Sequence, residues 1–468
     1  MLAATVFRPP PADGPFARDF EAYYAAGATW NRGGDPWSRA IWSTEATIPG
    51  VDRTRDELLP FVGPAAELPL LGAVARLPYA LAVKLWTSLL VVALLLVILA
   101  SFALGPGRGA RAAGAALLLA AAAGPTISAL ALGQAALIAA AGIALALFAL
   151  ERDRVIGAAA ASLAAAMQPN LALVLLARLR DRRAFVAVGT AFAAFAALTF
   201  AAGGGTHGFG TYLRVLSDHG RAERFDLIQF TPASNAWSIG APAAAAAAIG
   251  IAVSLLAVIA VIATIGRARL GPRDGTLLAL AALPFAVPFF HEHDFVVELI
   301  PLTILARVAR NGDRAWAGVA AGLILVDWLM LAQRVPAQPE VVLAGLAAAC
   351  AFAALGPGSR LRRSDLAASL TVLLVAAFAL PLAHMHPAPV WPDTLPPAFH
   401  APAAADAPAV WAAEQRAAGL LAPVPSWGVL RAIPLAGCLL LGIAIVASRR
   451  RVGDRPGGTT NTATATAS

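Results

Sequence analysis

Two aspartates near the start of the chain are the first residues that could carry out acid–base chemistry. Asp19 precedes the paired tyrosines Tyr23 and Tyr24, and Asp35 is followed by Pro36. A carboxylate in such a place can accept the proton of a weakly nucleophilic hydroxyl. The spacing of Asp19 and Tyr23 also puts them on one face of a helix. Alone, each aspartate is more often a helix cap or a turn residue.

A second polar group, His291 to Asp294, interrupts an apolar stretch and contains two histidines. Polar groups close to a bilayer are costly unless they are used or hydrated. We therefore expect His291 and His293 to face the same cavity as Asp19 and to contact an anionic group there. Histidine and carboxylate side chains also ligate zinc or manganese. Because the two histidines are only two residues apart and no second ligand cluster is evident, the sequence favours neither a metal nor another cofactor.

The chain that must position these groups is too apolar for a soluble protein. It has 468 residues, of which 59% are hydrophobic and 13% charged, with a mean hydropathy of +0.72. Soluble domains carry about 45–50% apolar and about 25% charged residues. The apolar residues come in blocks of about twenty, the length of a membrane-spanning helix. We predict an all-α polytopic protein of the cell membrane with about eleven spans, centred near Leu94, Leu119, Leu145, Phe192, Leu256, Leu280, Ile300, Leu323, Leu346, Val375 and Leu441.

The formal net charge of +8 comes from arginines that cluster between the apolar blocks. This distribution indicates topology rather than nucleic-acid binding, because cytoplasmic loops are enriched in arginine. It predicts an extracytoplasmic first loop (1–80), a transmembrane domain (81–450) and a disordered cytoplasmic tail (451–468). The other outer loops are 203–240, 291–294 and 383–427. Acidic, histidine and aromatic residues concentrate on the outer side, so chemistry is expected there.

Residues 155–179 are apolar but flanked by arginines on both sides. A single span would place one of the two clusters outside the cell. The middle of the segment contains Gln168, Pro169 and Asn170, and proline both ends a helix and disfavours helix in the preceding residue. We therefore predict two half-length helices that enter the membrane and return. Such a break is tolerated only inside protein or beside a hydrated cavity.

The order of these motifs resembles that of family-87 glycosyltransferases, which are membrane enzymes of the GT-C type. Asp19-Phe20, Tyr23-Tyr24 and Gly34-Asp35-Pro36-Trp37 are similar to the first extracytoplasmic loop of the family. Further along, the resembling positions are Gly133-Gln134, Gln168-Pro169 where the family usually has Lys-Pro, Asn235 in an outer loop, and the late histidine loop at His291. The resemblance covers Asp19 to Ala306, and the first helix of the family has no counterpart.

The resemblance implies a GT-C-like helical bundle that transfers a sugar, mannose in the family, from a polyprenyl-phosphate donor. The acceptor would be the hydroxyl of a lipid-linked or cell-envelope glycan, and the other partner is membrane lipid. Asp19 is then the general base, with Asp35 as the alternative, and an unperturbed aspartate with a pKa of ~3.9 would be ionised. The implied substrate-binding residues are Tyr23, Tyr24, Gln134, Gln168, Asn235, His291, His293 and Arg214.

The alternative function is transport or flipping of lipid-linked sugars. A transport path needs ionisable or polar residues within the membrane. The predicted helices have few of these, and the polar residues instead lie in the outer loops. The distribution therefore favours catalysis at the membrane surface.

Overall fold

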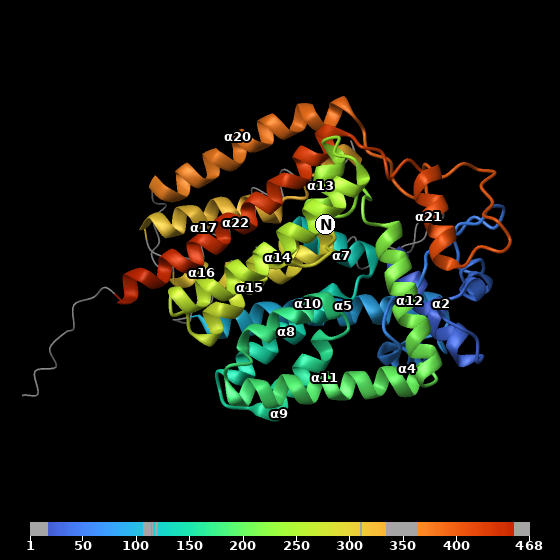
Figure 1. Ribbon diagram of the computed structural model, residues 1–468, viewed down its shortest axis with the longest axis horizontal. Coiled ribbons are helices and arrows are strands. Elements are labelled where there is room, and N and C mark those ends of the chain that lie inside the picture. The colour runs from blue at the N-terminus through green and yellow to red at the C-terminus, as the bar shows by residue number, and fades with distance from the viewer. Residues whose placement is uncertain are drawn as a thin grey trace, which may run out of the picture.

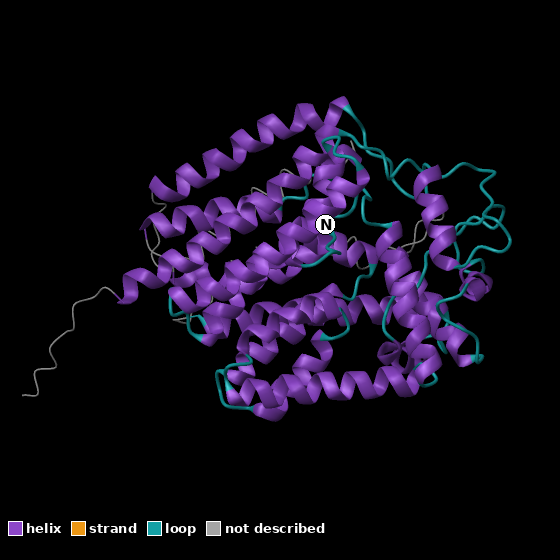
Figure 2. Cartoon of the chain, in the orientation of Figure 1, coloured by secondary structure: helices purple, strands orange, loops and turns teal. Residues whose placement is uncertain are grey.

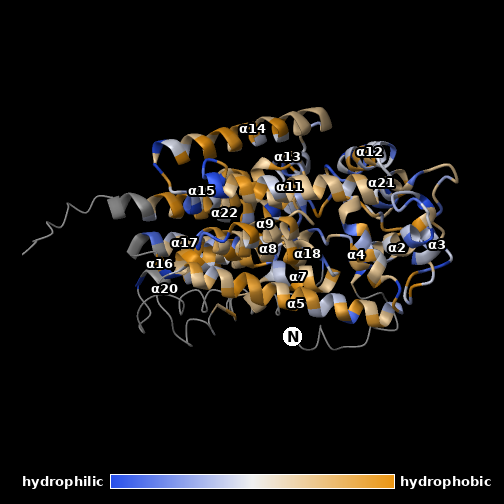
Figure 3. Cartoon of the chain, turned by 90° about the horizontal axis from the view of Figure 1, so that it is seen from below, coloured by the Kyte–Doolittle hydropathy of each residue, from blue (hydrophilic) through white to orange (hydrophobic). Residues whose placement is uncertain are grey.

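The computed structural model describes residues 17–105, 120–308, 311–333 and 363–453, together with Gly114, Ala116 and Leu117. In these parts of the chain the regular elements are helices joined by loops (Figure 2). Hydrophobic residues dominate the middle of the long helices, and hydrophilic residues gather towards both ends (Figure 3). This distribution is that of a helical membrane protein with two polar ends.

Within the described ranges, six apolar helices are long enough to cross a membrane. Their candidate spans are Tyr79–Leu104, Arg182–Ala202, Ala243–Arg267, Ala315–Gln333, Leu366–Met385 and Pro425–Ser448. They belong to α5 (Tyr79–Leu104), α11 (Arg182–Ala202), α14 (Ala243–Arg267), α17 (Asn311–Leu325) with α18 (Met330–Gln333), α20 (Arg363–Met385) and α22 (Pro425–Gly453). The structure thus confirms an all-α protein with several membrane-spanning helices.

The eleven predicted centres divide into three groups. Six of them lie in the long helices: Leu94, Phe192, Leu256, Leu323, Val375 and Leu441. Leu145, Leu280 and Ile300 lie in α8 (Ala136–Leu150), α15 (Pro272–Ala286) and α16 (Leu299–Val308), which have 15, 15 and 10 residues. These helices are shorter than the ~20 residues that a span needs. Leu119 and Leu346 lie outside the described residues.

The remaining helices are shorter. Those within the bundle are α7 (Gly124–Leu132), α9 (Val155–Ala165), α10 (Pro169–Ala172) and η3 (Leu173–Arg178). Those in the polar segments are α2 (Arg18–Asn31), η1 (Arg39–Ile41), α3 (Trp42–Glu45), η2 (Ala65–Glu67), α4 (Leu68–Val74), α12 (Thr206–Ala222), α13 (Pro232–Ser238), η4 (Glu292–Glu298) and α21 (Ala407–Ala417).

The loops predicted to lie outside meet at one end of the bundle, where α12 packs against α21 and α2 lies at the same end (Figure 1). The backbone N–H of Asp56 in the first loop donates to the carbonyl of Phe399 in the last loop at 3.0 Å. The N–H of Leu227 donates to the carbonyl of Leu420 at 3.0 Å, which joins the middle loop to the same segment. Segments far apart in sequence therefore build one polar end.

Arg178 and Arg273 lie at the opposite end, whereas arginines of the first loop such as Arg55 lie at the polar end. Arg178, at the end of η3, pairs with Glu151 after α8 at 3.1 Å. Arg273, at the start of α15, donates to the carbonyl of Leu104 at the end of α5 at 3.3 Å. The arginine clusters and the predicted outer loops thus lie at opposite ends of the bundle.

Residues 155–179 are broken in the middle, as Pro169 predicts. α9 ends at Ala165, and α10 begins at Pro169. Gln168 at the break donates to Gln134, while Arg178 at the far end of the segment returns to Glu151, next to the start of α9. The two flanks therefore lie at the same end of the bundle and the break lies towards the polar loops.

The predicted domain plan differs from the structure at the start of the C-terminal tail. The predicted disordered tail begins at Arg451, but α22 continues to Gly453, and the remaining residues of the tail lie outside the described part.

Candidate active site

Asp19 is held at the polar end of the bundle by the first turn of α2. The next residue, Phe20, is fully buried and stacks on Trp86 with ring centroids 5.2 Å apart. Trp86 donates its indole N–H to the carbonyl of Gly133 at 2.7 Å. Gly133 has a φ of 74°, and a Cβ on it would lie 2.8 Å from Cβ of Phe20. Glycine thus allows both the left-handed turn and the close approach of α2.

Gln134, the residue after this turn, connects three other predicted site residues. Its Oε1 accepts the hydroxyl of Tyr23 at 2.8 Å and the amide N–H of Gln168 at 3.0 Å. Its side chain is also hydrogen-bonded to Asp19. Because Oε1 already accepts two donors, Nε2 is the atom that donates to the carboxylate. Asp19, Tyr23, Gln134 and Gln168 therefore form one network.

The surrounding protein changes the acidity of Asp19. Burial raises the pKa of its carboxyl to about 7, although the positive charge of His291 and the hydrogen bond from Gln134 work to lower it. The pKa of Asp19 thus lies above that of an unperturbed aspartate, because burial disfavours the charged form. A carboxylate whose pKa lies near neutral pH is well matched to accept a proton.

Glu223, which directly follows α12, is the centre of a second network. Its side chain is buried, and four side chains converge on its carboxylate. Oε1 lies 2.6 Å from Nε1 of Trp411 and 3.3 Å from Nε2 of His219. Oε2 lies 3.2 Å from Nε2 of His291 and 3.1 Å from Nε2 of Gln229. The two nitrogens that share Oε2 are 3.0 Å apart. One carboxylate thus joins α12, the histidine loop and α21.

Glu223 and His291 stabilise each other in their charged forms. Burial alone would raise the pKa of Glu223, but the interactions with His219 and His291 outweigh it and hold this pKa well below its usual range. Burial likewise works to lower the pKa of His291, yet the hydrogen bond and charge of Glu223 raise it to about 9. His291 is therefore a cation at neutral pH, and the charges of His291 and Asp19 influence each other.

His293 and Asp294 lie beside this pair. Oδ2 of Asp294 accepts the backbone N–H of His291 at 2.9 Å, and its buried Oδ1 has no hydrogen-bond partner among the described residues. Nε2 of His293 lies 3.8 Å from this Oδ1. In the described part of the chain, these three residues each offer one ligand atom within 4.8 Å of the others, so distance alone would allow a metal ion. The expectation that catalysis needs no metal stays a prediction.

Tyr24 and Asp35 point elsewhere. Tyr24 donates its hydroxyl to the carbonyl of Leu77 at 2.8 Å and packs edge-on against the ring of Tyr79. Asp35 lies in an exposed turn, where its Oδ1 accepts the N–H of Trp37 at 2.9 Å. Both residues thus have structural contacts in the first loop.

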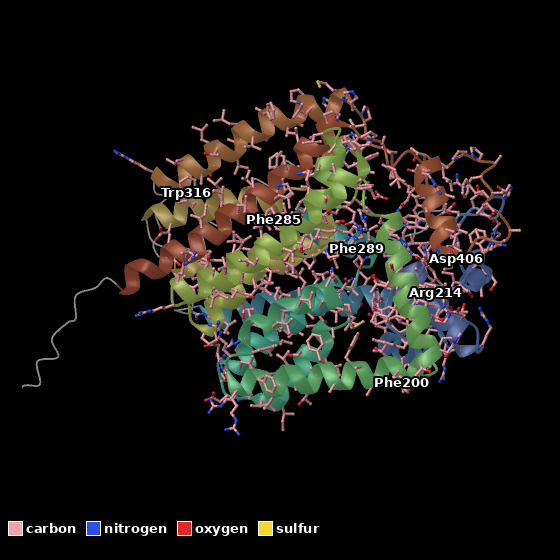
Figure 4. All side chains as sticks on the ribbon, viewed as in Figure 1. Phe200, Arg214, Phe285, Phe289, Trp316 and Asp406 are labelled. Carbon is pink, nitrogen blue, oxygen red and sulfur yellow. The ribbon has the colours of Figure 1, made fainter. Side chains whose placement is uncertain are left out.

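Arg214 and Asn235 also lie apart from Asp19. α12 buries the side that carries Tyr212 and His219, whereas Arg214 is exposed on the other side (Figure 4). Asn235 lies in α13, which packs against α14 and α22. Their predicted contacts with substrate stay predictions.

The sequence contained one overlooked signal for the second network. His219 lies on the same face of α12 as Gly208, Tyr212 and Val215, and these four residues have the spacing of the buried side of an amphipathic helix. This period would have placed His219 inside and Arg214 outside. Glu223 lies between arginines in a charged loop and gave no such signal, and Trp411 lies almost two hundred residues away in a proline-rich segment.

The fold and this end of the bundle define a helical membrane protein with two networks of polar side chains at one polar end. Residues 61–290 match the profile of glycosyltransferase family 87. The chain belongs to this family and is a glycosyltransferase, as its motifs predict. The match to this family favours a transferase over the alternative of a transporter. No curated protein and no solved structure matches the chain.

The matched residues contain only part of the site. Gln134, Gln168 and Glu223 lie within residues 61–290. Asp19 precedes the match and His291 directly follows it. The roles of these two residues therefore depend on the resemblance of the first loop and on the geometry described above.

Proposed function

We propose that the protein transfers a sugar, mannose by the expectation of its family, from a polyprenyl-phosphate donor to a hydroxyl of a lipid-linked or cell-envelope glycan. The observation that carries this proposal is that Asp19, a partly buried carboxylate, and His291, a buried histidine, influence each other's charge at the same polar end. Asp19 has a pKa of about 7 and His291 a pKa of about 9, so between these pH values the first is a base and the second a cation.

The reaction needs both groups. Asp19 accepts the proton of the acceptor hydroxyl. The oxygen of that hydroxyl attacks the anomeric carbon of the donor sugar at the same time. The bond between that carbon and the phosphate oxygen breaks, and polyprenyl phosphate leaves with the electron pair. The cationic ring of His291 stabilises the negative charge that develops on this phosphate. Gln134 holds the carboxylate of Asp19 by a hydrogen bond, and Glu223 keeps His291 charged and in place.

A lipid-linked donor agrees with the surroundings of the site. The outer side of α12 exposes Phe209, Leu213 and Leu216, at 41%, 49% and 45% of their surface. The inner side of the same helix places His219 against Glu223. An amphipathic helix of this kind lies in the membrane interface with its apolar side in lipid. The polyprenyl chain can then remain in the bilayer while the phosphate reaches the polar network.

We further propose that this polar end faces the outside of the cell, because the arginines around Arg178 and Arg273 lie at the other end. In this topology residues 155–179 form a re-entrant pair whose tip carries Gln168. The side chain of Asn170, also at the tip, donates to the carbonyl of Phe289 at 3.3 Å. The polar break would therefore serve the site, which explains why non-helical backbone is tolerated there.

The test is transfer by the purified full-length protein in lipid vesicles. Radiolabelled polyprenyl-phosphate mannose, with the glucose and galactose analogues as a panel, would be supplied with a lipid-linked glycan acceptor. We expect Asp19→Asn to fold and bind donor but to lose about 10²–10⁴-fold in rate, as is typical for a positioned acid–base group. Asp35→Asn is the matched control, because Asp35 lies in an exposed turn, and it should transfer at nearly the normal rate.

Near-full transfer by Asp19→Asn together with an inactive Asp35→Asn would assign the base to Asp35 instead. Label that moves only from a nucleotide sugar would contradict the lipid-linked donor. If glucose or galactose moves in place of mannose, the sugar assignment is wrong while the assignment of the base stands.

A further inference from the structure

A cavity of about 300 Å³ lies at the arginine-bearing end of the bundle, opposite the candidate active site. It is formed by the end of η3 and the turn after it, the end of α14, and the start of α15. Gly266 and Gly271 line it, and a Cβ on either would meet no heavy atom within 4 Å. The cavity therefore has open space next to its backbone walls.

The cavity is positively charged. Arg178, Arg180 and Arg269 line it, against the single carboxylate of Asp181. Arg178 is only 3% exposed; although its terminal nitrogens pair with Glu151 and Asp181, its buried Nε has no hydrogen-bond partner among the described residues. Arg180 and Arg269 are exposed to the open side. A cavity with this lining favours an anion.

The backbone adds to this field. α15 has 15 residues, and its first residues, from Pro272, lie on the wall of the cavity. The N-terminus of a helix carries a partial positive charge and free N–H groups, which favour phosphate. The preference of arginine for the cytoplasmic side of membranes explains the presence of these charges. It does not explain why three of them, and a helix N-terminus, surround one cavity.

The cavity also adjoins lipid. α14 is apolar, and none of the residues in its membrane-spanning window is buried in the protein. Leu256, Ile259 and Ile262 are 64%, 60% and 56% exposed along it. Hydrocarbon chains can lie along this helix while a headgroup attached to them reaches the arginines at its end.

We propose that this cavity binds the phosphate headgroup of an anionic phospholipid in the leaflet at the arginine-bearing end. The phosphate oxygens accept hydrogen bonds from Arg180, Arg269 and Nε of Arg178, and the acyl chains lie on α14. Basic pockets between membrane helices are known to bind anionic headgroups in this way. The proposal is independent of the sugar-transfer function, because the cavity and the candidate active site lie at opposite ends of the bundle.

The test is native mass spectrometry of the full-length protein released from mixed micelles that contain phosphatidylglycerol or phosphatidylcholine. We expect the wild-type protein to retain phosphatidylglycerol in preference to phosphatidylcholine. A surface arginine contributes about fivefold to the affinity for an anionic lipid, so Arg180→Gln with Arg269→Gln should weaken retention roughly 25-fold. Arg154→Gln is the matched control, because Arg154 is an exposed arginine outside the cavity lining, and it should retain the lipid as the wild type does.

A second variant tests the cavity itself without changing charge. Gly266→Leu fills the open space and should weaken retention as strongly as the double arginine variant. The proposal would be overturned if Gly266→Leu retained phosphatidylglycerol as the wild type does, or if Arg154→Gln lost as much of it as the double arginine variant. Either result would show that lipid retention depends only on general surface charge. Displacement of the lipid by glycerol phosphate at equal concentration would overturn the assignment to a membrane lipid and indicate a site for soluble phosphate.

Discussion

Replacement of Glu223 by glutamine tests whether this residue keeps His291 charged. Glutamine has nearly the same shape and can still accept hydrogen bonds, but it removes the negative charge that faces the imidazole. The pKa of His291, about 9 in the native protein, should then fall to its ordinary value of 6.5 or below, because burial works in that direction. At pH 8 the protonated fraction of His291 would fall from about 90% to about 3%, a loss of about 30-fold.

The assay is kcat/KM for sugar transfer as a function of pH, which reports the ionisations of the free enzyme. The wild type should give a bell-shaped profile, with its rising limb near pH 7 from Asp19 and its falling limb near pH 9 from His291. In Glu223→Gln the falling limb should move below pH 7, and the maximal rate should drop because the two ionisations then overlap. Glu292→Gln is the control: its carboxylate accepts from Ser128 at 2.5 Å, and its loss should leave the falling limb in place.

A Glu223→Gln enzyme that is slower at all pH values but keeps the falling limb near pH 9 would refute this reasoning. Glu223 would then support the fold without setting the charge of His291. A wild-type profile with no falling limb between pH 8 and 10 would show that transfer does not depend on the positive charge of His291.

Three further predictions follow from the contacts. Trp411→Phe removes the indole N–H that reaches Glu223 at 2.6 Å but leaves all charges, so transfer should fall about tenfold while the falling limb of the pH profile stays near 9. Gly27→Ala places a Cβ 2.4 Å from the backbone of α4, which should lower the stability to thermal unfolding by about 1–3 kcal/mol and slow transfer by moving α2. The control is Gly189→Ala, where the space is open, and it should change neither stability nor transfer. A cysteine introduced beside Arg180 should resist a membrane-impermeant reagent applied to intact cells, and labelling there would overturn the topology.

The sequence allowed much of the first network to be predicted, for a physical reason. Asp19, Gln134 and Gln168 each lie at a helix end or a helix break. Alternation of the arginine clusters puts those ends on the same side of the membrane. Polar residues at such ends must then meet each other or water, because they cannot stay in lipid. Their convergence is therefore a consequence of topology, which the sequence encodes locally.

The second network could not be predicted in this way. The contact between Glu223 and Trp411 joins two outer segments whose packing is decided by tertiary structure. Hydrophobicity also overstated the lengths of the helices. An apolar block of 10–15 residues can be a buried helix as well as part of a span, and α8 and α16 are almost completely buried among other helices. Burial, which the sequence does not report directly, separates these two cases.

The two networks impose opposite electrostatic requirements on neighbouring groups, and the structure meets both. A base is effective when burial raises its pKa towards neutral pH, but the same burial would discharge a histidine. Asp19 is hydrogen-bonded by the neutral side chain of Gln134, and burial outweighs this bond and the charges of His291 and Arg18, so its pKa rises. His291 has a carboxylate within hydrogen-bond distance, so pairing dominates and its charge is kept. In the proposed reaction Glu223 would thus allow a proton acceptor and a cation to coexist at one end of the bundle, and we expect a carboxylate at this position to be required for transfer.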